Sequence, residues 1–545
     1  MAFSKFASLY NVKIYFALFL LFCMVIFVQT SFNYVGNIYA YLLFTFMSFF
    51  LLFSGFRKNA IFFDAFIGIF LWLGFWFKFS FRVAYMDSLF NEGTGLFDGS
   101  GHSYNNALLA ASIAFFAIIT VSICREKYLF NYPDKSSLIQ NTGLFHFYSN
   151  NRSYILCFFL LFVIVIALFN YHYVIYQRGT IPLTSLPLGL NGIVKWLLLF
   201  GFTSIGALII SYEFLLYKTQ KYNVALISLF EVFISSLSML SRGMIINSVA
   251  IFYGVWLFSK SYNVKLTPKY IITCLLIFAT LFSISLYLTN YLRVHNLFYL
   301  RLTSEQIVGN RIDAEREVDL KENAEKNITK DSQSNSHDVE YVYYIEKNYF
   351  DKLPLSKKYH RIIVTTYYKF IGDFSRNIKT IQLLFIDRWV GIEALLAVSS
   401  YPDKGWSLWR KAWQETLSYN QKTFFDEEIL KHTSPYDTVD FSKHHHISVV
   451  GFIAFSFYNG SKMLLFVFIA LFSLLAVFIE YSAYKLGKGN LILCSLISCV
   501  VAYRFVHFGY APIQSYKIFG AIYLNLFLVF IFNLLLSKTN KKSLS

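Results

Sequence analysis

The chain has 545 residues, of which 56% are hydrophobic and only 14% are charged. Soluble proteins usually carry about 25% charged residues, so this composition excludes an ordinary soluble domain. Apolar runs of roughly 20 residues recur along the chain, and each is long enough to cross a bilayer as a helix. A membrane β-barrel would instead show alternating segments of about ten residues, which are absent.

The net charge of +17 does not indicate nucleic-acid binding, because of where the charges lie. The long polar segment 291–445 holds 22 basic and 22 acidic residues and is therefore neutral. The rest of the chain holds 26 basic and 9 acidic residues, so the whole excess lies in the short connections between apolar runs. This distribution is typical of the positive-inside bias of membrane proteins.

The apolar runs predict twelve membrane spans. The first is expected to be a retained helix, because it is too long for the apolar part of a signal peptide and has no small-residue cleavage site. The expected spans are 12–29, 37–56, 59–77, 106–123, 153–170, 192–216, 223–240, 243–259, 270–290, 463–483, 490–507 and 517–537. A polar loop, 78–105, is expected to follow the third span.

Twelve spans place both termini on one side of the membrane. Eighteen of the 26 basic residues outside the long segment fall on that side, which identifies it as the cytoplasm. The expected fold is therefore all-α and polytopic, with a large, mostly helical extracytoplasmic loop between spans nine and ten. The predicted regions are 1–290 with nine spans, 291–462 as an outer cap, and 463–545 with three spans.

The outer cap is expected to contain several kinds of segment. Residues 301–340 are charged and loosely helical in pattern, whereas apolar residues recur at helical spacing through 360–397. The second pattern predicts one or two amphipathic helices on the membrane or over a cavity. Residues 447–458 are expected to form a short interfacial helix that leads into the tenth span.

Basic residues on the outer side or inside spans outnumber the acidic residues that could pair with them. Only Asp64 and Glu231 are acidic and placed well inside predicted spans. An anionic ligand would resolve this imbalance, since arginine binds phosphate oxygens bidentately. The alternative is that each cation reaches the lipid headgroups. The basic residues in question are Lys78, Arg82, Arg178, Lys195, Arg242, Lys462, Arg504 and Lys517.

The densest polar patch of the cap contains Arg388 and Glu393, followed by several tryptophans that include Trp406. Five positions on a helix separate two residues by about 140°, so Arg388 and Glu393 need not touch each other. Both could equally lie on the solvated face of an amphipathic helix. The aromatic rings could stack on sugars or lie at the membrane interface.

Metal and cysteine chemistry are not indicated. Three consecutive histidines, 444–446, do not share a helical face, so a single one, His446, is a better candidate for a proton acceptor than the three are for a metal site. All six cysteines lie in or beside apolar spans, which favours buried hydrophobic roles over disulfides or zinc ligation. No nucleotide-binding or hydrolase motif is present.

Together with the architecture, three short strings resemble the bacterial O-antigen, or surface polysaccharide, polymerases of the Wzy type. This is a divergent family of integral membrane glycosyltransferases similar to the GT-C class. The strings are GLFDGSG at 95–101, DRWVGIEA at 387–394 and VVGFIAFSFYNGS at 449–461. The architectural resemblance covers the whole chain, whereas the strings cover few residues.

The resemblance implies a specific reaction at the outer face of the bacterial inner membrane. A hydroxyl of one lipid-linked repeat unit attacks the anomeric carbon of a glycan on a polyprenyl diphosphate, and lipid diphosphate leaves. The implied partners are these two lipid-linked glycans, the bilayer and a chain-length regulator, with no nucleic acid. No metal or other cofactor is expected.

The same resemblance implies roles for particular residues. Cations would bind the leaving diphosphate, a base would accept the hydroxyl proton, and an aromatic shelf would hold sugars. The implied catalytic residues are Arg388, Glu393 and His446. The implied diphosphate- or glycan-binding residues are Lys78, Arg82, Asp98, Arg178, Arg242, Arg504 and Trp406.

Three other interpretations remain open from the sequence. A ligase of the same broad fold, which transfers finished glycan to another acceptor, would have nearly the same sequence features. A flippase or transporter of lipid-linked glycans would more often show internal repeats and short loops. A structural or sensory membrane protein is the third alternative.

Overall fold

The computed structural model describes the two stretches of chain that carry the predicted spans and parts of the cap. Residues Met1–Arg293 and Asp387–Ser545 belong to one compact unit, so 387–462 groups with the predicted spans on either side of the cap. The predicted amphipathic segment 360–385 lies outside the described residues. The residues that the structure describes are 2–292, 386, 389–416, 421–434, 447–509 and 512–542, with gaps at 87, 89, 91–92, 133–138, 179–181, 185, 218–221, 242, 265 and 290.

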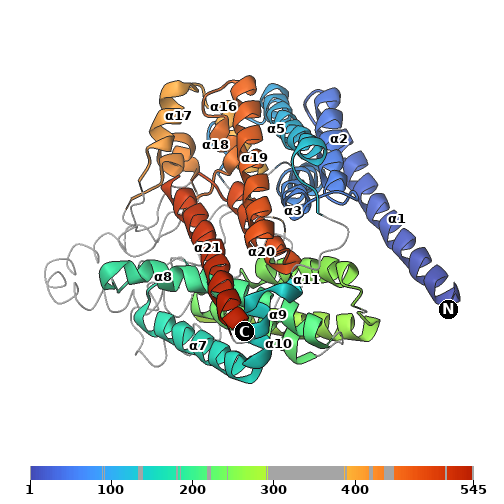
Figure 1. The fold of residues 1–545 in the computed structure, drawn as a ribbon. Helices are drawn as coiled ribbons and strands as arrows, with labels where there is room; N and C mark the ends of the chain where they lie inside the picture. Colours follow the sequence, from blue (N-terminus) through green and yellow to red (C-terminus); the bar gives the residue numbers. More distant parts are fainter. Residues whose placement is uncertain are drawn as a thin grey trace, which may run out of the picture. The chain divides into compact units, whose positions relative to one another are not determined.

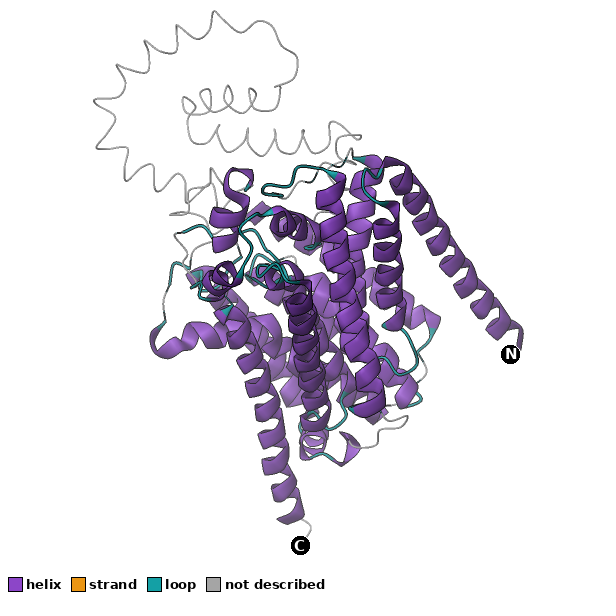
Figure 2. Ribbon diagram, turned by 90° about the horizontal axis from the view of Figure 1, so that it is seen from above, coloured by secondary structure: helices purple, strands orange, loops and turns teal. Residues whose placement is uncertain are grey.

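All regular secondary structure in the described ranges is helical (Figures 1 and 2). From the N-terminus to the predicted cap, the helices are α1 (Ala2–Asn33), α2 (Ile38–Ser54), α3 (Phe62–Leu71), η1 (Trp72–Phe77), α4 (Lys78–Tyr85), α5 (Gly101–Tyr128), η2 (Ile139–Asn141), α6 (Gly143–Asn150), α7 (Arg152–Tyr173), η3 (Pro187–Gly189), α8 (Leu190–Trp196), η4 (Leu197–Gly201), α9 (Phe202–Tyr217), α10 (Tyr222–Ser238), α11 (Met244–Ser261) and the unlabelled helix Pro268–Thr289. The remaining helices are α16 (Ile392–Ser400), α17 (Trp406–Trp413), η5 (Phe425–Leu430), η6 (Lys431–Thr433), α18 (Phe452–Ser456), α19 (Lys462–Leu486), α20 (Leu491–Val506) and α21 (Ile513–Lys542).

The prediction of an all-helical, polytopic membrane protein is confirmed at this level. Within the described residues, nine helices are long and apolar enough to span a membrane. Three shorter apolar helices, Ile38–Ser54, Leu226–Ser238 and Leu491–Val506, coincide with the remaining predicted spans. The count of twelve spans stays a prediction. The interfacial helix predicted at 447–458 is shorter, since only Phe452–Ser456 is helical.

The third span differs from its prediction in an informative way. The sequence predicts its end before Lys78, with a polar loop after it, whereas the helix continues without a break from Phe62 to Tyr85. Lys78 and Arg82 are helical and almost completely buried, with 0% and 2% of their surfaces exposed. The prediction failed because hydropathy treats every charge as a span boundary, although a charge can remain inside a helix bundle when it has partners.

Two spans contain a segment of π-helix. In Phe62–Tyr85 the π segment is η1, and in Leu190–Tyr217 it is η4. A π segment widens the helix and is frequent at functional sites. Both segments lie beside residues that carry the candidate site described below, since Lys78 follows η1 directly and Lys195 lies two residues before η4 begins.

Helix α20 lies at the centre of the packing and contacts α3, α9, α11 and α19. It approaches α11 closely, because a Cβ atom at Gly254 would lie only 2.8 Å from the Ile492 Cα atom. Ser495 Oγ donates a 2.6 Å hydrogen bond to the Ala250 carbonyl across the same interface. Small residues and interhelical hydrogen bonds are typical of helix association in lipid. The lipid tails are as apolar as the helix surfaces, so no hydrophobic force drives the helices together.

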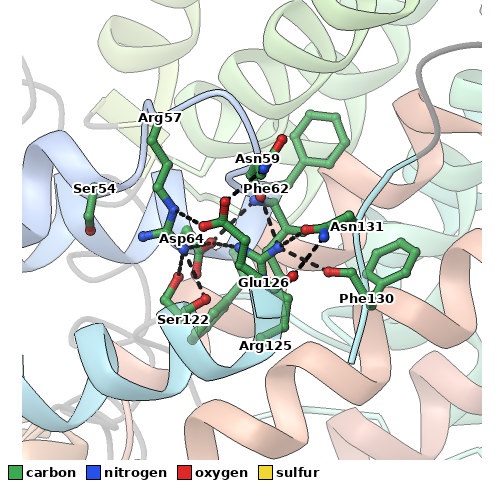
Figure 3. Close-up of polar contacts among 12 residues, drawn as sticks. Ser54, Arg57, Asn59, Phe62, Asp64, Ser122, Arg125, Glu126, Phe130 and Asn131 are labelled. Atoms are coloured by element: carbon green, nitrogen blue, oxygen red, sulfur yellow. Dashed lines mark hydrogen bonds and ion pairs between the residues drawn. The ribbon is translucent and has the colours of Figure 1, made fainter. Parts of the chain in front are cut away.

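A network of ion pairs, the innermost of which is buried, joins the end of α5 to the start of α3 (Figure 3). The Arg125 guanidinium lies 2.7 Å from the Asp64 carboxylate and also donates to the carbonyls of Asn59 and Phe130. Beside it, Arg57 pairs with Glu126 at 2.8 Å. Because every charged group in this network has an opposite charge, it serves to hold the helix ends together.

Two further carboxylates, Glu213 and Glu480, are buried close to the ends of their helices, beyond the two that the sequence placed inside spans. Glu480 of α19 accepts 2.8 Å hydrogen bonds from the Phe62 and Phe63 amides and so caps the N-terminus of α3. Glu213 pairs with Arg152 at the start of α7. These pairs and the Asp64 network all lie at helix ends that the predicted topology places in the cytoplasm.

Candidate functional site

Two residues that the sequence named separately meet in the structure. The Lys78 ammonium lies 2.6 Å from Oε1 of Glu393 and donates a 3.0 Å hydrogen bond to the Trp389 carbonyl. Only 1% of the Lys78 side chain and 3% of the Glu393 side chain are exposed. This buried ion pair joins the third span to α16, which begins just beyond the cap segment that contains Trp389.

The backbone approach beside this pair explains why α16 begins where it does. A Cβ atom at Gly74 in η1 would lie 2.3 Å from the Val390 carbonyl oxygen, and one at Gly391 would lie 2.3 Å from the Gly74 oxygen. Both positions therefore require glycine. After Gly391 the chain turns into α16, in which all residues from Ile392 to Ser399 are buried.

The ion pair gives Glu393 a role in holding α16 against the third span. Its carboxylate is in the first turn of α16, where the helix dipole favours a negative charge. The prediction that Glu393 is the catalytic base is not tested by this geometry and stays a prediction. Arg82, one turn after Lys78 and therefore on the same helical face, is also buried.

A second group of cations surrounds the phenol of Tyr176, in the loop after α7. The Lys195 ammonium lies over the Tyr176 ring at 4.5 Å from its centroid. The Arg178 side chain hydrogen-bonds Tyr176 and Tyr503, and the Arg178 amide donates to the Met239 carbonyl at 3.0 Å. The loop is thus fixed to the end of α10, with its arginine facing α20.

Arg504 of α20 completes this group, which we call the cation cluster: Arg178, Lys195 and Arg504. Its Nε atom donates to Ser515 Oγ at 2.8 Å, and its Nη1 atom donates to the His507 carbonyl at 3.1 Å. Its Nη2 atom is buried and has no hydrogen-bond partner among the residues that the structure describes. The third nitrogen of the guanidinium is therefore available to a ligand.

The electrostatic effect of the cation cluster is visible at Tyr176. Burial alone would raise the pKa of this phenol, but Arg178, Lys195 and Arg504 together lower its pKa. In the described part of the chain, no ion pair joins Arg178, Lys195 or Arg504 to a carboxylate. The cluster therefore differs from the Asp64 network, where each cation has a carboxylate beside it.

Aromatic rings connect the cation cluster to the Lys78–Glu393 pair. The Phe70 ring stacks on Trp389, with centroids 6.2 Å apart, and meets Tyr503 edge-on at 6.4 Å. Trp389 supplies the carbonyl that Lys78 binds, and Tyr503 is hydrogen-bonded to Arg178. The two charged groups are therefore parts of one packed region at the predicted outer end of the spans.

The predicted aromatic cluster of the cap is present on α17. Trp406 stacks on Trp409 with centroids 4.7 Å apart, and Trp409 stacks on Trp413 at 5.1 Å. Trp406 is 57% exposed, whereas Trp413 packs against Phe455 and Tyr516. The exposed end of this stack offers a ring face to a sugar or to the lipid interface.

Asp98 lies on the surface at the turn that precedes α5. Its carboxylate accepts a hydrogen bond from the Ser100 amide at 2.9 Å, and Ser100 is the N-cap of α5. Hydrogen bonds from the Ser100 amide and from the Ser103 and Ser100 hydroxyls lower the pKa of Asp98 to about 2. Through these contacts Asp98 orders the turn before α5. Its predicted role in binding glycan stays a prediction.

Three of the predicted site residues, Arg242, Arg388 and His446, lie outside the described residues. Tyr176, Lys195 and Tyr503 were not among the predicted site residues, although Lys195 was one of the eight outer basic residues. The sequence signal that could have identified the two tyrosines was their proximity to the arginines, because Tyr176 lies two positions before Arg178 and Tyr503 directly precedes Arg504.

The described residues contain no group of three metal-ligating His, Cys, Asp or Glu side chains.

Comparisons with protein-family models, with curated proteins and with solved structures find no match to this chain.

Proposed function

We propose that this protein is a membrane glycosyltransferase that polymerises polyprenyl-diphosphate-linked oligosaccharide repeat units at the outer face of a bacterial inner membrane. The observation that carries the proposal is the cation cluster, which gathers three positive side chains around Tyr176 with no ion pair to a carboxylate among the described residues. A partly buried excess of positive charge in a membrane protein favours an anionic partner, and a diphosphate in the adjoining leaflet supplies one.

The leaving group explains why such a cluster would accelerate this reaction. The acceptor hydroxyl oxygen forms a bond to the anomeric carbon of the donor, and the bond from that carbon to the diphosphate oxygen breaks. Both electrons of the broken bond remain on the diphosphate, whose charge therefore increases in the transition state. Cations fixed before the reaction stabilise that developing charge at no cost in reorganisation.

The residues of the cluster would divide this task by their chemistry. Arg504 would use its unpartnered Nη2 atom as a donor to a phosphate oxygen. Arg178 is held in place by two phenols, and Lys195 contributes a compact charge from the side of α8. The proton released by the acceptor hydroxyl requires a base, for which Glu393 and His446 remain the proposed candidates.

Deletion of the gene in its own strain tests the proposed function. If the protein is the polymerase, the surface glycan should shorten to a single repeat unit on its lipid anchor, as seen by gel electrophoresis and mass spectrometry. Accumulation of lipid-linked repeat units inside the cell would instead identify a flippase. Polymer of normal length that remains on its lipid carrier would identify a ligase.

The topology that supports this proposal is also testable. In a variant without the six native cysteines, a cysteine at exposed Ser407 on α17 should react with an impermeant thiol reagent added to the outer face. A cysteine at exposed Asn150, at the end of α6, should react only after the membrane is opened. The reverse labelling pattern would place the cation cluster in the cytoplasm and contradict the proposed reaction.

A further inference from the structure

A cavity between the last part of α9, the first part of α10, α11 and the helix Pro268–Thr289 has no role in the proposed reaction. The empty space in it, counted together with the part that is open to the outside, is about 720 Å³. Its wall is almost entirely apolar and includes Ile210, Leu229, Ile251, Val255, Ile271 and Leu275. In a membrane-spanning region, a cavity with such a wall fits a hydrocarbon chain.

The rim of the cavity is positively charged. Trp256 forms part of the wall, and the Lys260 ammonium lies 3.5 Å from the centroid of its ring. Lys269 is exposed beside Tyr270, which also lines the cavity. The helices α11 and Pro268–Thr289 contain no acidic residue, and Glu213, near the end of α9, is paired with Arg152.

The depth of the cavity matches one leaflet of a bilayer. Ile251 in its wall and Lys260 at its rim are nine residues apart on α11, which corresponds to about 14 Å along the helix. Half of a typical hydrocarbon core is about 15 Å. A lipid whose phosphate contacts Lys260 would therefore place its acyl chain along the wall of the cavity.

We propose that this cavity is a binding site for an anionic glycerophospholipid, with one acyl chain between α10, α11 and Pro268–Thr289 and the phosphate at Lys260 and Lys269. The charge at the rim selects an anionic headgroup, and the apolar wall selects a chain rather than a soluble anion. Because the cavity lies at the opposite helix ends from the cation cluster, this site is independent of the proposed reaction.

Native mass spectrometry of the purified full-length protein with phosphatidylglycerol or phosphatidylcholine tests the site. Each lysine near a membrane surface adds about fivefold to the affinity for an anionic lipid, so the Lys260→Ala/Lys269→Ala variant should lose about 25-fold of the preference for phosphatidylglycerol. Lys485→Ala is the matched control, since Lys485 also lies over a ring, that of Tyr481 at 5.5 Å, away from the cavity. Its preference should be unchanged.

A second variant tests the cavity itself. Ile251→Trp fills the space, so it should reduce the retention of both lipids while the protein still elutes as a single peak in size-exclusion chromatography. An unchanged preference in the double lysine variant, or equal loss in Lys485→Ala, would overturn the proposal. So would full retention of both lipids by Ile251→Trp.

Discussion

Polymer synthesis is expected to fall by about 100-fold or more when Arg504 is replaced by alanine, while the protein still reaches the membrane. The guanidinium makes only two hydrogen bonds with described residues, to Ser515 and to the His507 carbonyl, so its loss should disturb the fold little. Removal of one preorganised donor to a developing negative charge typically costs about 10²–10³-fold in rate. The measurement is polymer formed from lipid-linked repeat units by the purified protein.

Two variants make this result specific. Arg504→Lys retains a charge but not the planar group of donors, so it should recover only part of the activity. Lys517→Ala removes an exposed cation near Ser515 and should have nearly wild-type activity. If Arg504→Ala and Lys517→Ala gave the same polymer, the cation cluster would not be the diphosphate site.

The second large effect concerns the fold as well as the activity. Glu393→Gln leaves the Lys78 ammonium buried without its carboxylate, and breaking such a pair costs roughly 3–5 kcal/mol. The variant should therefore show a lower unfolding temperature and a reduced amount of folded protein. A fluorescence-detected thermal unfolding assay in detergent measures both.

The double variant Lys78→Met/Glu393→Leu separates the structural role from the catalytic one. Replacing both charges with apolar side chains of similar size should restore most of the unfolding temperature. If Glu393 is the acceptor base, this stable protein should still make no polymer. Restored polymer would show that Glu393 only holds α16, and an unrestored unfolding temperature would contradict the importance of the ion pair.

The helices that carry the site were predictable because their signal is local. Apolar runs long enough to span a bilayer identified the Arg152–Tyr173 and Lys462–Leu486 helices to within a few residues. The same signal misplaced the end of the third span, because it cannot show that Lys78 will find a carboxylate. In general, the prediction was poorest where a charge inside a helix is compensated by another part of the chain.

The composition of the site was predictable only in part, because its residues come together through packing. Lys78 and Glu393 are 315 positions apart, and no spacing rule relates them. Arg178 and Arg504 were recognised as outer cations in need of an anion, but their convergence on Tyr176 depends on how α20 packs beside the loop after α7. The sequence therefore identified most of the described charged groups without showing which of them face one another.

The π segment before Lys78 means that the helix can lose one residue ahead of this part of the site without turning its charged side chains. Compared with a regular α-helix, one wide turn accommodates an additional residue, and one residue corresponds to a rotation of about 100°. Deleting any single residue from Trp72–Phe77 would let the helix return to α geometry. Lys78 and Arg82 would then keep their direction toward Glu393, whereas the same deletion in a helix without a π segment would turn the residues after it by about 100°.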